Sequence, residues 1–568
     1  MAAVCAEAAR DAFVQYEERF DEITRRARNR FLNRDWRGSY GDAAERLKLY
    51  SEVVNCVTEQ LEELMRSRLR ERSIWMAMKA VYSASIAQSV RWEIAESFFN
   101  SLTRRVFSTE GVDQSIEFVD TDFDAPPAQL PTEIARVESG ARLQDLLARV
   151  LTNESTGGFA REDWADLDKS CERAAERIGA GGHARASAIE TATSLFYRGR
   201  GAYLIGRILP SAPNAAPLAF ALALRHADGQ AVEIDAVLLG ESDLAVLFSY
   251  TRAYFRVDAP FPFQLVRWLR ELMPRKRLAD LYNVLGYNRH AKTEFYRDFV
   301  RHLQSSTDRF IEAAGTRGMV MMVFTLPSYE AVFKLIRDRF DAPKEGDRRD
   351  VMDRYRIVFE HDRAGRLVDA HAFEHLRIPR NRFEPTLLEE LLRDASETVR
   401  LDREDIVISH AYVERRVRPL NLFFAERTGD YVAAACDYGQ AIKDLAASNI
   451  FPGDLLTKNF GLTRHDRVVF YDYDELCFVT ECNFRELPQA TSHEEEMSAE
   501  PWFSVRPNDI FPEEFPNFLA FPEGAREALM AQHGDLFHPE FWRQMQEKFR
   551  AGDLPEIFPY PRERRLAD

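Results

Sequence analysis

The chain has 568 residues, enough for about two to four domains. Its composition, 45% hydrophobic, 30% charged and 12% aromatic, excludes a disordered or fibrous protein. Its 76 basic and 92 acidic side chains give a net charge of −16, which argues against general affinity for nucleic acid or anionic membranes. The longest strongly apolar stretch, Met319–Leu326, is far shorter than the ~20 residues of a membrane helix, and the N-terminus lacks a signal-peptide pattern. Six scattered cysteines without C-x-x-C spacing indicate reduced thiols. We therefore expect a soluble, cytoplasmic, multidomain protein.

The first two hundred residues have the periodicity of α-helices. Apolar residues recur at spacings of three and four between charges in Ala8–Arg28, Asp42–Arg72 and Ile74–Leu102. The period then changes at 217–239 to that of a β-hairpin with Asp228-Gly229 at its turn. Helical patterns return in Pro262–Leu272 and Leu278–Leu285.

Short β-rich runs begin near Phe310 and alternate with helical stretches. The predicted strands are Gly318–Leu326, Ala331–Ile336, Ile406–Val413 and Arg467–Tyr471, and the predicted helices are Pro385–Thr398 and Val432–Ser448. The tail beyond Asn483 is rich in proline and aromatic residues, which is typical of an ordered but irregular surface segment. The pattern predicts a mostly helical domain to about residue 305, followed by an α+β domain.

Two features of the second half are typical of a nucleotide site. Gly315 and Gly318 stand in a turn between β-prone segments, where backbone N–H groups can approach phosphate oxygens without a Cβ in the way. Lys334 lies mid-strand among apolar residues, in a chain that has only ten lysines against sixty-six arginines. Taken alone, each has a plain alternative: an ordinary β-turn for the glycines and a solvent-facing edge strand for Lys334.

Two acidic features follow. Asp454 and Asn459 have D-x-x-x-x-N spacing, which supplies a carboxylate for an acceptor hydroxyl and an amide oxygen for a metal ion. An apolar strand then runs into Asp472, Asp474 and Glu475, and three crowded carboxylates favour a bound Mg²⁺ or Mn²⁺. The alternatives are an ordinary helix-to-strand loop and a solvated acidic turn.

Together the four features follow the order of the protein-kinase signature set, with Asp472 thirteen positions after Asn459. Three departures are evident. The glycine loop is shorter than G-x-G-x-x-G, Pro452-Gly453 stands where His-Arg is usual, and Asp472-Tyr473-Asp474 replaces D-F-G without a later A-P-E motif. Because the catalytic-loop arginine is missing, we do not expect control by activation-loop phosphorylation.

Over essentially its whole length, the chain resembles the bacterial isocitrate dehydrogenase kinase/phosphatase family. The matching strings are RWEIAESFFNSL (91–102), LFYRGRGAYLIGR (195–207), HAKTE (290–294), RGMVMMVFTLP (317–327), EHDRAGR (360–366), NIFPGDLLTKNFG (449–461) and VVFYDYDE (468–475). The resemblance implies an α+β fold, with a protein-kinase-like bilobal domain at 306–568 preceded by a mostly α-helical regulatory domain at 1–305. It puts the N-lobe at about 306–417 and the C-lobe at about 418–568.

The resemblance also implies roles for individual residues. Asp454 would be the kinase catalytic aspartate, Asn459 and Asp472 would hold the metal, and Asp369 would be the aspartate required for phosphatase activity. The implied ATP-binding residues are Ala313, Ala314, Gly315, Thr316, Arg317, Gly318, Met319, Lys334, Glu414 and Lys458, with Glu414–Val417 at the hinge that holds adenine. For the helix glutamate that pairs with the lysine in protein kinases, Glu360 is a candidate.

The family reaction is reversible phosphorylation of the NADP-dependent isocitrate dehydrogenase homodimer, which directs isocitrate to the glyoxylate bypass or to the citric acid cycle. The resemblance implies ATP, ADP for the phosphatase step, Mg²⁺ or Mn²⁺, and AMP as an allosteric effector; it leaves open a homodimer of the chain itself. We expect residues 483–523 to recognise the dehydrogenase through Trp502, Phe503, Phe511 and Phe515, although these aromatic residues can equally pack on their own domain. Other readings are a small-molecule phosphotransferase of the aminoglycoside type and a pseudokinase scaffold.

Overall fold

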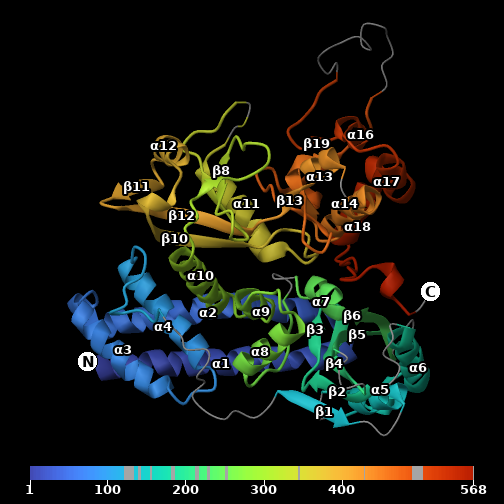
Figure 1. Cartoon of the computed structure of the whole chain (residues 1–568), viewed down its shortest axis with the longest axis horizontal. Helices are drawn as coiled ribbons and strands as arrows, with labels where there is room; N and C mark the ends of the chain where they lie inside the picture. The colour runs from blue at the N-terminus through green and yellow to red at the C-terminus, as the bar shows by residue number, and fades with distance from the viewer. Residues whose placement is uncertain are drawn as a thin grey trace. The chain divides into compact units, whose positions relative to one another are not determined.

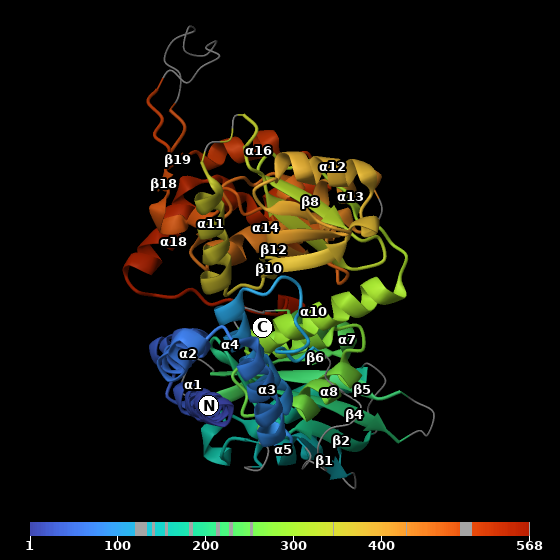
Figure 2. The same ribbon diagram turned by 90° about the vertical axis from the view of Figure 1, so that its left-hand side faces the viewer.

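The computed structural model describes residues 1–119, 133–138, 142–153, 157–180, 186–211, 216–226, 231–249, 254–342, 344, 346–427, 429–488 and 503–566. The chain forms two compact units: blue to green in Figures 1 and 2, together with the red C-terminal end, is unit 1, and yellow to red is unit 2. Unit 1 consists of Met1–Ser306 with Phe558–Asp568, and unit 2 of Thr307–Ile557. Across the described residues, no helix is long and apolar enough to cross a membrane.

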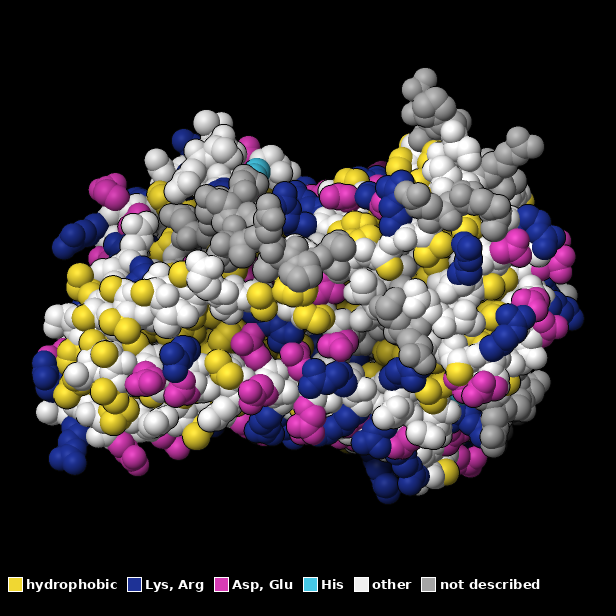
Figure 3. All heavy atoms as spheres, turned by 90° about the horizontal axis from the view of Figure 1, so that it is seen from below, with side chains coloured by type: hydrophobic (Ala, Val, Ile, Leu, Met, Phe, Trp, Pro, Cys, Tyr) yellow, Lys and Arg dark blue, Asp and Glu magenta, His cyan; other side chains and the backbone are white. Residues whose placement is uncertain are grey.

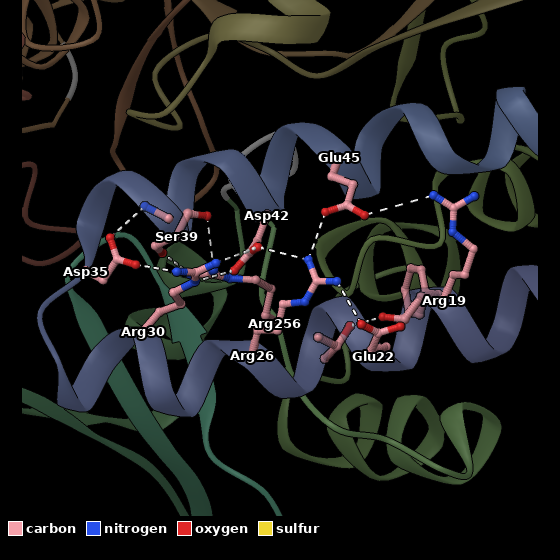
Figure 4. A network of polar contacts seen from close by, with 12 residues as sticks. Arg19, Glu22, Arg26, Arg30, Asp35, Ser39, Asp42, Glu45 and Arg256 are labelled. Carbon is pink, nitrogen blue, oxygen red and sulfur yellow. Dashed lines mark hydrogen bonds and ion pairs between the residues drawn. The ribbon is translucent and has the colours of Figure 1, made fainter.

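Unit 1 contains long N-terminal helices and a sheet. Its helices are α1 (Ala2–Leu32), α2 (Trp36–Met65), α3 (Arg72–Ile86), α4 (Trp92–Phe107), α5 (Leu143–Leu151), α6 (Leu167–Ile178), α7 (Gly240–Leu247), α8 (Pro262–Leu272), α9 (Leu278–Val284) and α10 (Asn288–Ser305). Asp35 caps α2 by accepting the backbone N–H of Gly38 at 2.9 Å. Arg26 and Arg30 of α1 share the buried carboxylate of Asp42 on α2, at 3.3 and 3.0 Å, which fixes the α1–α2 hairpin (Figure 4).

The helix predicted over Ile74–Leu102 is two helices. The chain leaves the helical path between α3 and α4, where the Ser89 hydroxyl accepts the backbone N–H of Arg91 at 3.2 Å. The buried Arg91 guanidinium then binds Asp21 at 3.0 Å and the carbonyl of Ala259 at 3.1 Å. This tertiary ion pair overrides the helical periodicity of the sequence.

The sheet of unit 1 corrects the helical prediction for the first two hundred residues. Its strands are β1 (Ile134–Glu138), β2 (Ala186–Ala192), β3 (Phe196–Arg198), β4 (Gly201–Pro210), β5 (Leu218–His226) and β6 (Val232–Leu239), in the order β1-β2-β4-β5-β6 with β3 beside β4. The antiparallel pairing of β5 with β6 confirms the predicted hairpin, while its turn, Asp228-Gly229, lies outside the described residues.

Burial on both faces explains why β2 to β4 were missed. On β4, Tyr203 and Ile205 join the core that contains α1 and α4, whereas Leu204 and Ile208 join a second core with α5 and α6. A strand covered on both sides is a continuous apolar run, which periodicity alone does not distinguish from a buried helix.

Some apolar side chains of unit 1 remain in contact with solvent. Exposed examples on α1 and α3 are Val4, Val14, Met76 and Val81. In Figure 3, hydrophobic side chains gather on the left, the side on which α1 begins in Figure 1.

Glu93 of α4 makes the stability of unit 1 depend on pH. Its carboxyl group is fully buried and accepts the Tyr282 hydroxyl at 3.3 Å, and this burial raises the pKa of Glu93 from 4.5 to about 8. The folded state therefore holds a proton that the unfolded chain releases, so stability falls as the pH rises from about 4.5 to about 8. We expect Glu93→Gln to flatten this decline and to be the more stable protein at pH 8, by at least about 1.4 kcal/mol. Thermal unfolding of both proteins at pH 5, 6.5 and 8 measures the difference, and parallel declines would contradict the assignment.

Unit 2 begins with an antiparallel sheet. Its elements are β7 (Ile311–Glu312), β8 (Met321–Thr325), β9 (Ala331–Ile336), α11 (Arg348–His361), β10 (Ala370–Pro379), α12 (Pro385–Asp394), β11 (Val399–Asp402) and β12 (Asp405–Arg415). The strand order is β10-β12-β9-β8-β7, with β11 beside β12. The predicted strands and helix of this region are confirmed, the helix ending at Asp394 rather than Thr398.

The remainder of unit 2 is built around helix α14. Its elements are β13 (Arg418–Pro419), α13 (Leu420–Glu426), α14 (Tyr431–Ala446), β14 (Ile450–Phe451), β15 (Phe460–Leu462), β16 (Val468–Phe470), β17 (Cys477–Phe478), β18 (Asn483–Phe484), β19 (Asp509–Ile510), α16 (Phe515–Phe518), α17 (Ala525–His533) and α18 (Pro539–Arg550). The predicted helix and strand here are confirmed as α14 and β16.

The tail beyond Asn483 is more regular than the sequence indicates, because α17 and α18 pack into the core and bury Trp542 completely. Phe503 lies 5.3 Å from Phe511 between ring centroids, and Phe515 packs on the core of unit 2. Trp502 lies outside the described residues.

Candidate active site

Lys334 is buried in the middle of β9. The strand lies between β12 and β8, so the solvent-facing edge position is excluded. The Nζ atom lies 2.8 Å from Oε2 of Glu414 and donates to the carbonyl of Tyr471 at 2.7 Å. The lysine charge is therefore held next to the backbone that leads directly into Asp472.

The carboxylate partner of Lys334 is Glu414, and the candidate Glu360 is wrong. Glu360 is exposed near the end of α11, where it lies 3.9 Å from the His361 ring. Glu414 comes from β12, whose register places Tyr412 opposite Lys334. Burial raises the pKa of Glu414, while the Lys334 charge acts against this rise.

Helix α11 reaches this ion pair through Tyr355. The Tyr355 hydroxyl donates to Oε1 of Glu414 at 2.9 Å. Its ring stacks on Tyr412 with centroids 3.6 Å apart and meets the Tyr473 ring edge-on at 5.1 Å. Tyr355 thus connects α11, the Lys334–Glu414 pair and the acidic segment, a role that no sequence motif indicates.

The predicted phosphate loop, Ala313–Met319, joins β7 to β8. Gly315 has φ +131° and an added Cβ there would lie 3.5 Å from Pro419, so the loop passes close to the start of α13. At Gly318 a Cβ would come within 2.7 Å of the Met321 carbonyl oxygen, which explains the glycine. The exposed Arg317 forms an ion pair with Glu390 on α12.

Asp454 lies in the loop between β14 and β15, with Asn459 at the other end of the same loop. Oδ1 of Asp454 accepts the backbone N–H of Leu456 at 2.8 Å, and the Asn459 amide donates to the Asp454 carbonyl at 3.4 Å. Burial raises the pKa of Asp454, opposed by the Leu456 N–H and the charge of Lys458. Gly453 has φ +82°, and a side chain there would collide with Glu475.

The acidic segment after β16 is tied to that loop. The backbone N–H of Tyr471 donates to the Asn459 carbonyl at 3.0 Å, and the Tyr471 hydroxyl donates to the carbonyl of Lys458. Burial, and then the charge of Asp472, raise the pKa of Asp474 to about 7. Lys344 forms an ion pair with Glu475.

These donors suit a hard divalent cation. No cluster of three or more His, Cys, Asp or Glu with metal-binding geometry occurs in the part of the chain that the structure describes. Asn459 and Asp472 nevertheless supply an amide and a carboxylate oxygen, the ligands that Mg²⁺ takes beside phosphate groups. Burial is the main cause of the raised pKa of Asp474, and the neighbouring Asp472 carboxylate adds to it; a bound cation would offset that second contribution.

Asp369 reaches the same region from the segment before β10. The backbone N–H of Val368 donates to the Phe470 carbonyl at 3.0 Å, and the Tyr473 hydroxyl donates to the Val368 carbonyl at 2.6 Å. Asp369 therefore lies beside the end of β16, two residues before Asp472, with Nε2 of His371 3.5 Å from its Oδ2. No local pattern distinguishes Asp369 from other aspartates at strand ends.

Arg366 fixes this segment in place. Its guanidinium binds Asp444 at 2.8 Å and Asp437 at 2.7 Å, both on α14, and donates to the Val468 carbonyl at 2.8 Å. Burial tends to raise the pKa of Asp437, but the Arg366 charge prevails and lowers it. No sequence motif indicates this cluster.

The structure thus brings together the predicted site residues outside the 313–319 loop, whereas the side-chain contacts of that loop are with α12. Backbone hydrogen bonds join the Asp454–Asn459 loop to the acidic segment, and the side chain of Lys334 and the Asp369 segment meet that segment from the sheet.

Two family models match the chain. The kinase domain of isocitrate dehydrogenase kinase/phosphatase (AceK) matches residues 308–562, and the regulatory domain of the same family matches residues 6–307. A protein named isocitrate dehydrogenase kinase/phosphatase from Anaeromyxobacter sp. (strain Fw109-5) is 44% identical over 100% of this chain and 98% of its own length. One of the same name from Xanthomonas euvesicatoria pv. vesicatoria (strain 85-10) is 43% identical over 99% of this chain and 97% of its own.

Proposed function

The chain belongs to the isocitrate dehydrogenase kinase/phosphatase family, and on that premise we propose that it is a bifunctional enzyme acting on NADP-dependent isocitrate dehydrogenase. It inactivates the dehydrogenase by phosphorylating a serine and reactivates it by removing the phosphate, which controls flux between the citric acid cycle and the glyoxylate bypass. A phosphoserine carries about −1.5 to −2 charges and repels an anionic substrate. The full-length family match, together with the grouping of Lys334, Asp454 and Asp472, carries this proposal.

The proposed architecture of unit 2 is a protein-kinase-like pair of lobes. The six-stranded sheet β7–β12 together with α11 would form the N-lobe, 306–417, and the part built around α14 would form the C-lobe, 418–568. The lysine in the third strand of the sheet and the D-x-x-x-x-N loop after the central helix support it. The region 1–305 would be the regulatory domain that responds to AMP.

In the kinase direction, ATP would bind between the loop 313–319 and the hinge Glu414–Val417. The side chains of Lys334 and Lys458 would hold its phosphates, and Asn459 with Asp472 would hold Mg²⁺ or Mn²⁺, which neutralises charge on the phosphoryl group. Asp454 would orient the serine hydroxyl and accept its proton. The raised pKa of Asp454 makes it a better base than an exposed aspartate.

In the phosphatase direction, Asp369 would orient a water molecule for attack on the phosphoserine while ADP occupies the nucleotide site. The same lysine and metal ligands that stabilise a transferring phosphoryl group would then serve hydrolysis. Residues 483–523 would contact the dehydrogenase homodimer. We further propose a cytoplasmic protein that can itself form a homodimer.

Asp369→Ala separates the two activities. We expect the variant to lose phosphatase activity by about two orders of magnitude, the usual value of a positioned acid or base, and to keep its kinase activity. Both rates are measured on isocitrate dehydrogenase, as label uptake from γ-labelled ATP and as label release with ADP. Asp353→Ala, on the exposed face of α11, is the matched control and should change neither rate. Equal loss of both activities in Asp369→Ala would overturn the role of Asp369.

A further inference from the structure

Cys477 and Cys482 form a close pair of thiols in unit 2. Their Sγ atoms lie 3.6 Å apart, although the two residues are five positions apart in the sequence. The intervening residues Val479–Glu481 form a 3-10 turn that folds Cys482 back towards Cys477. A disulfide requires a sulfur–sulfur distance of about 2.05 Å, so the sulfurs need to approach by only about 1.5 Å.

The two thiols differ in exposure and acidity. Cys477 is partly exposed, whereas Cys482 is buried. The hydrogen bond from Cys482 lowers the pKa of Cys477, and the neighbouring Arg354 guanidinium lowers it further; the same bond raises the pKa of Cys482. Cys477 is therefore the thiol that an oxidant reaches first, and Cys482 lies close enough to attack the oxidised Cys477 sulfur.

Hydrogen bonds to α18 and to Asn449 hold the turn that carries Cys482. Gln546 of α18 donates to the Cys482 carbonyl at 2.7 Å and to the Val479 carbonyl at 2.8 Å. Asn449 accepts the backbone N–H of Thr480 at 3.1 Å. Because these bonds hold the turn, closure of a disulfide would draw Cys477 and β17 towards Cys482.

Cys477 is joined to both acidic segments of the candidate active site. On β17 it is paired with Phe451 of β14, three residues before Asp454. Along the chain it follows Asp474 and Glu475, and Glu475 packs against Gly453. A shift of β17 would therefore be transmitted to both segments, the one that carries Asp454 and the one that carries Asp472.

We propose that Cys477 and Cys482 are an oxidation site for hydroperoxides, and that their reversible disulfide lowers phosphoryl transfer at the adjacent site. The Cys477 thiolate attacks the peroxide, the O–O bond breaks, and a sulfenic acid and an alcohol or water form. The Cys482 thiol then attacks the sulfenic sulfur, the S–S bond forms and water leaves. The protein loses two electrons, which the peroxide accepts, and a dithiol reverses the reaction.

Peptide mass analysis tests the first part without reference to any enzymatic activity. The full chain is treated with hydrogen peroxide, free thiols are alkylated, and the tryptic peptide Val468–Arg485, which holds both cysteines, is weighed. We expect a form of this peptide that is lighter by two hydrogens and carries no alkyl groups. Cleavage after Glu481, which lies between the two cysteines, should leave the two fragments joined by the disulfide. Alkylation of both cysteines after peroxide treatment, or a disulfide to another cysteine, would overturn the proposal.

Variants test the link to activity, and this arm rests on the proposed kinase function. We expect oxidation to lower label transfer to isocitrate dehydrogenase at least about tenfold, with recovery in dithiothreitol, because displacements near 1 Å are costly at a reacting centre. Cys482→Ser and Cys482→Ala should each keep the untreated rate and lose the thiol-reversible inhibition, while Cys56→Ser should behave like the parent. A disulfide that forms with kinase activity unchanged would overturn the link while leaving the oxidation site established.

Discussion

Asp454→Asn lowers the rate of phosphoryl transfer to isocitrate dehydrogenase by about 10²–10⁴-fold, the contribution of a positioned base. Asparagine has nearly the same size and its amide oxygen can still accept the Leu456 N–H, so the loop keeps its shape. What is lost is the carboxylate that we propose takes the serine proton. Label uptake from γ-labelled ATP measures the effect, with nucleotide affinity expected to change little because the proposed phosphate contacts of Lys334 and Lys458 are intact.

Asp466→Asn is the matched control for this substitution. Asp466 lies at the exposed turn between β15 and β16 with φ +56°, a conformation that asparagine adopts readily. We expect its kinase rate to stay within about twofold of the parent, since exposed substitutions of this kind have small effects. Equal rates for the two variants would show that Asp454 is not the base.

Arg366→Met destabilises unit 2 by about 3–5 kcal/mol, the cost of removing one partner from a buried ion pair. The substitution leaves Asp437 and Asp444 next to each other on α14 without their shared cation, and it removes the hydrogen bond to the Val468 carbonyl. Because the pKa of Asp437 is lowered in the folded state, the pair stabilises above pH 3.8 and its contribution is lost as the pH falls through the folded-state pKa.

Urea unfolding at pH 7.5 measures this loss as a shift of the midpoint at unchanged slope. Arg393→Met is the control: Arg393 is largely exposed and pairs with its neighbour Asp394 at the end of α12. Such exposed pairs contribute about 0–1 kcal/mol. A midpoint for Arg366→Met no lower than that of Arg393→Met would contradict the structural role of the Arg366 cluster.

Local pattern determined how much of the fold could be predicted. The strands β8, β9, β12 and β16 are short apolar runs between turn residues, and all four were predicted. The strands β2 to β4 are apolar on both faces, because Tyr203 and Leu204 enter different cores, and such a run carries no period-two signal. The break between α3 and α4 depends on the Arg91–Asp21 ion pair, which joins positions seventy residues apart.

The candidate site shows the same limit. Lys334, Asp454, Asn459 and Asp472 were found because their types, order and spacing together match one chemistry. The pairing of Lys334 with Glu414 depends on the register of β9 against β12, and the bond from Tyr355 depends on how α11 packs on that sheet. These contacts are set by tertiary structure, so the sequence did not identify Glu414 as the partner of Lys334. Asp369 came from the family resemblance, and only the structure places its segment beside β16.

The family match also bears on the two alternatives. A small-molecule phosphotransferase or a scaffold would not require residues 6–307 to match the regulatory domain of a kinase/phosphatase family as well. The retained Lys334–Glu414 pair, with its buried geometry, further disfavours a scaffold without catalysis.

Transfer and release of one label test most directly whether this single site runs both reactions. The full chain is mixed with purified NADP-dependent isocitrate dehydrogenase, γ-labelled ATP and Mg²⁺, and label on the dehydrogenase is followed together with its activity; excess ADP and AMP are then added. We expect label uptake with loss of dehydrogenase activity, then label release with recovery of activity. Absence of label uptake by the dehydrogenase would contradict the proposed function, and uptake that the second addition does not reverse would contradict the phosphatase half of it.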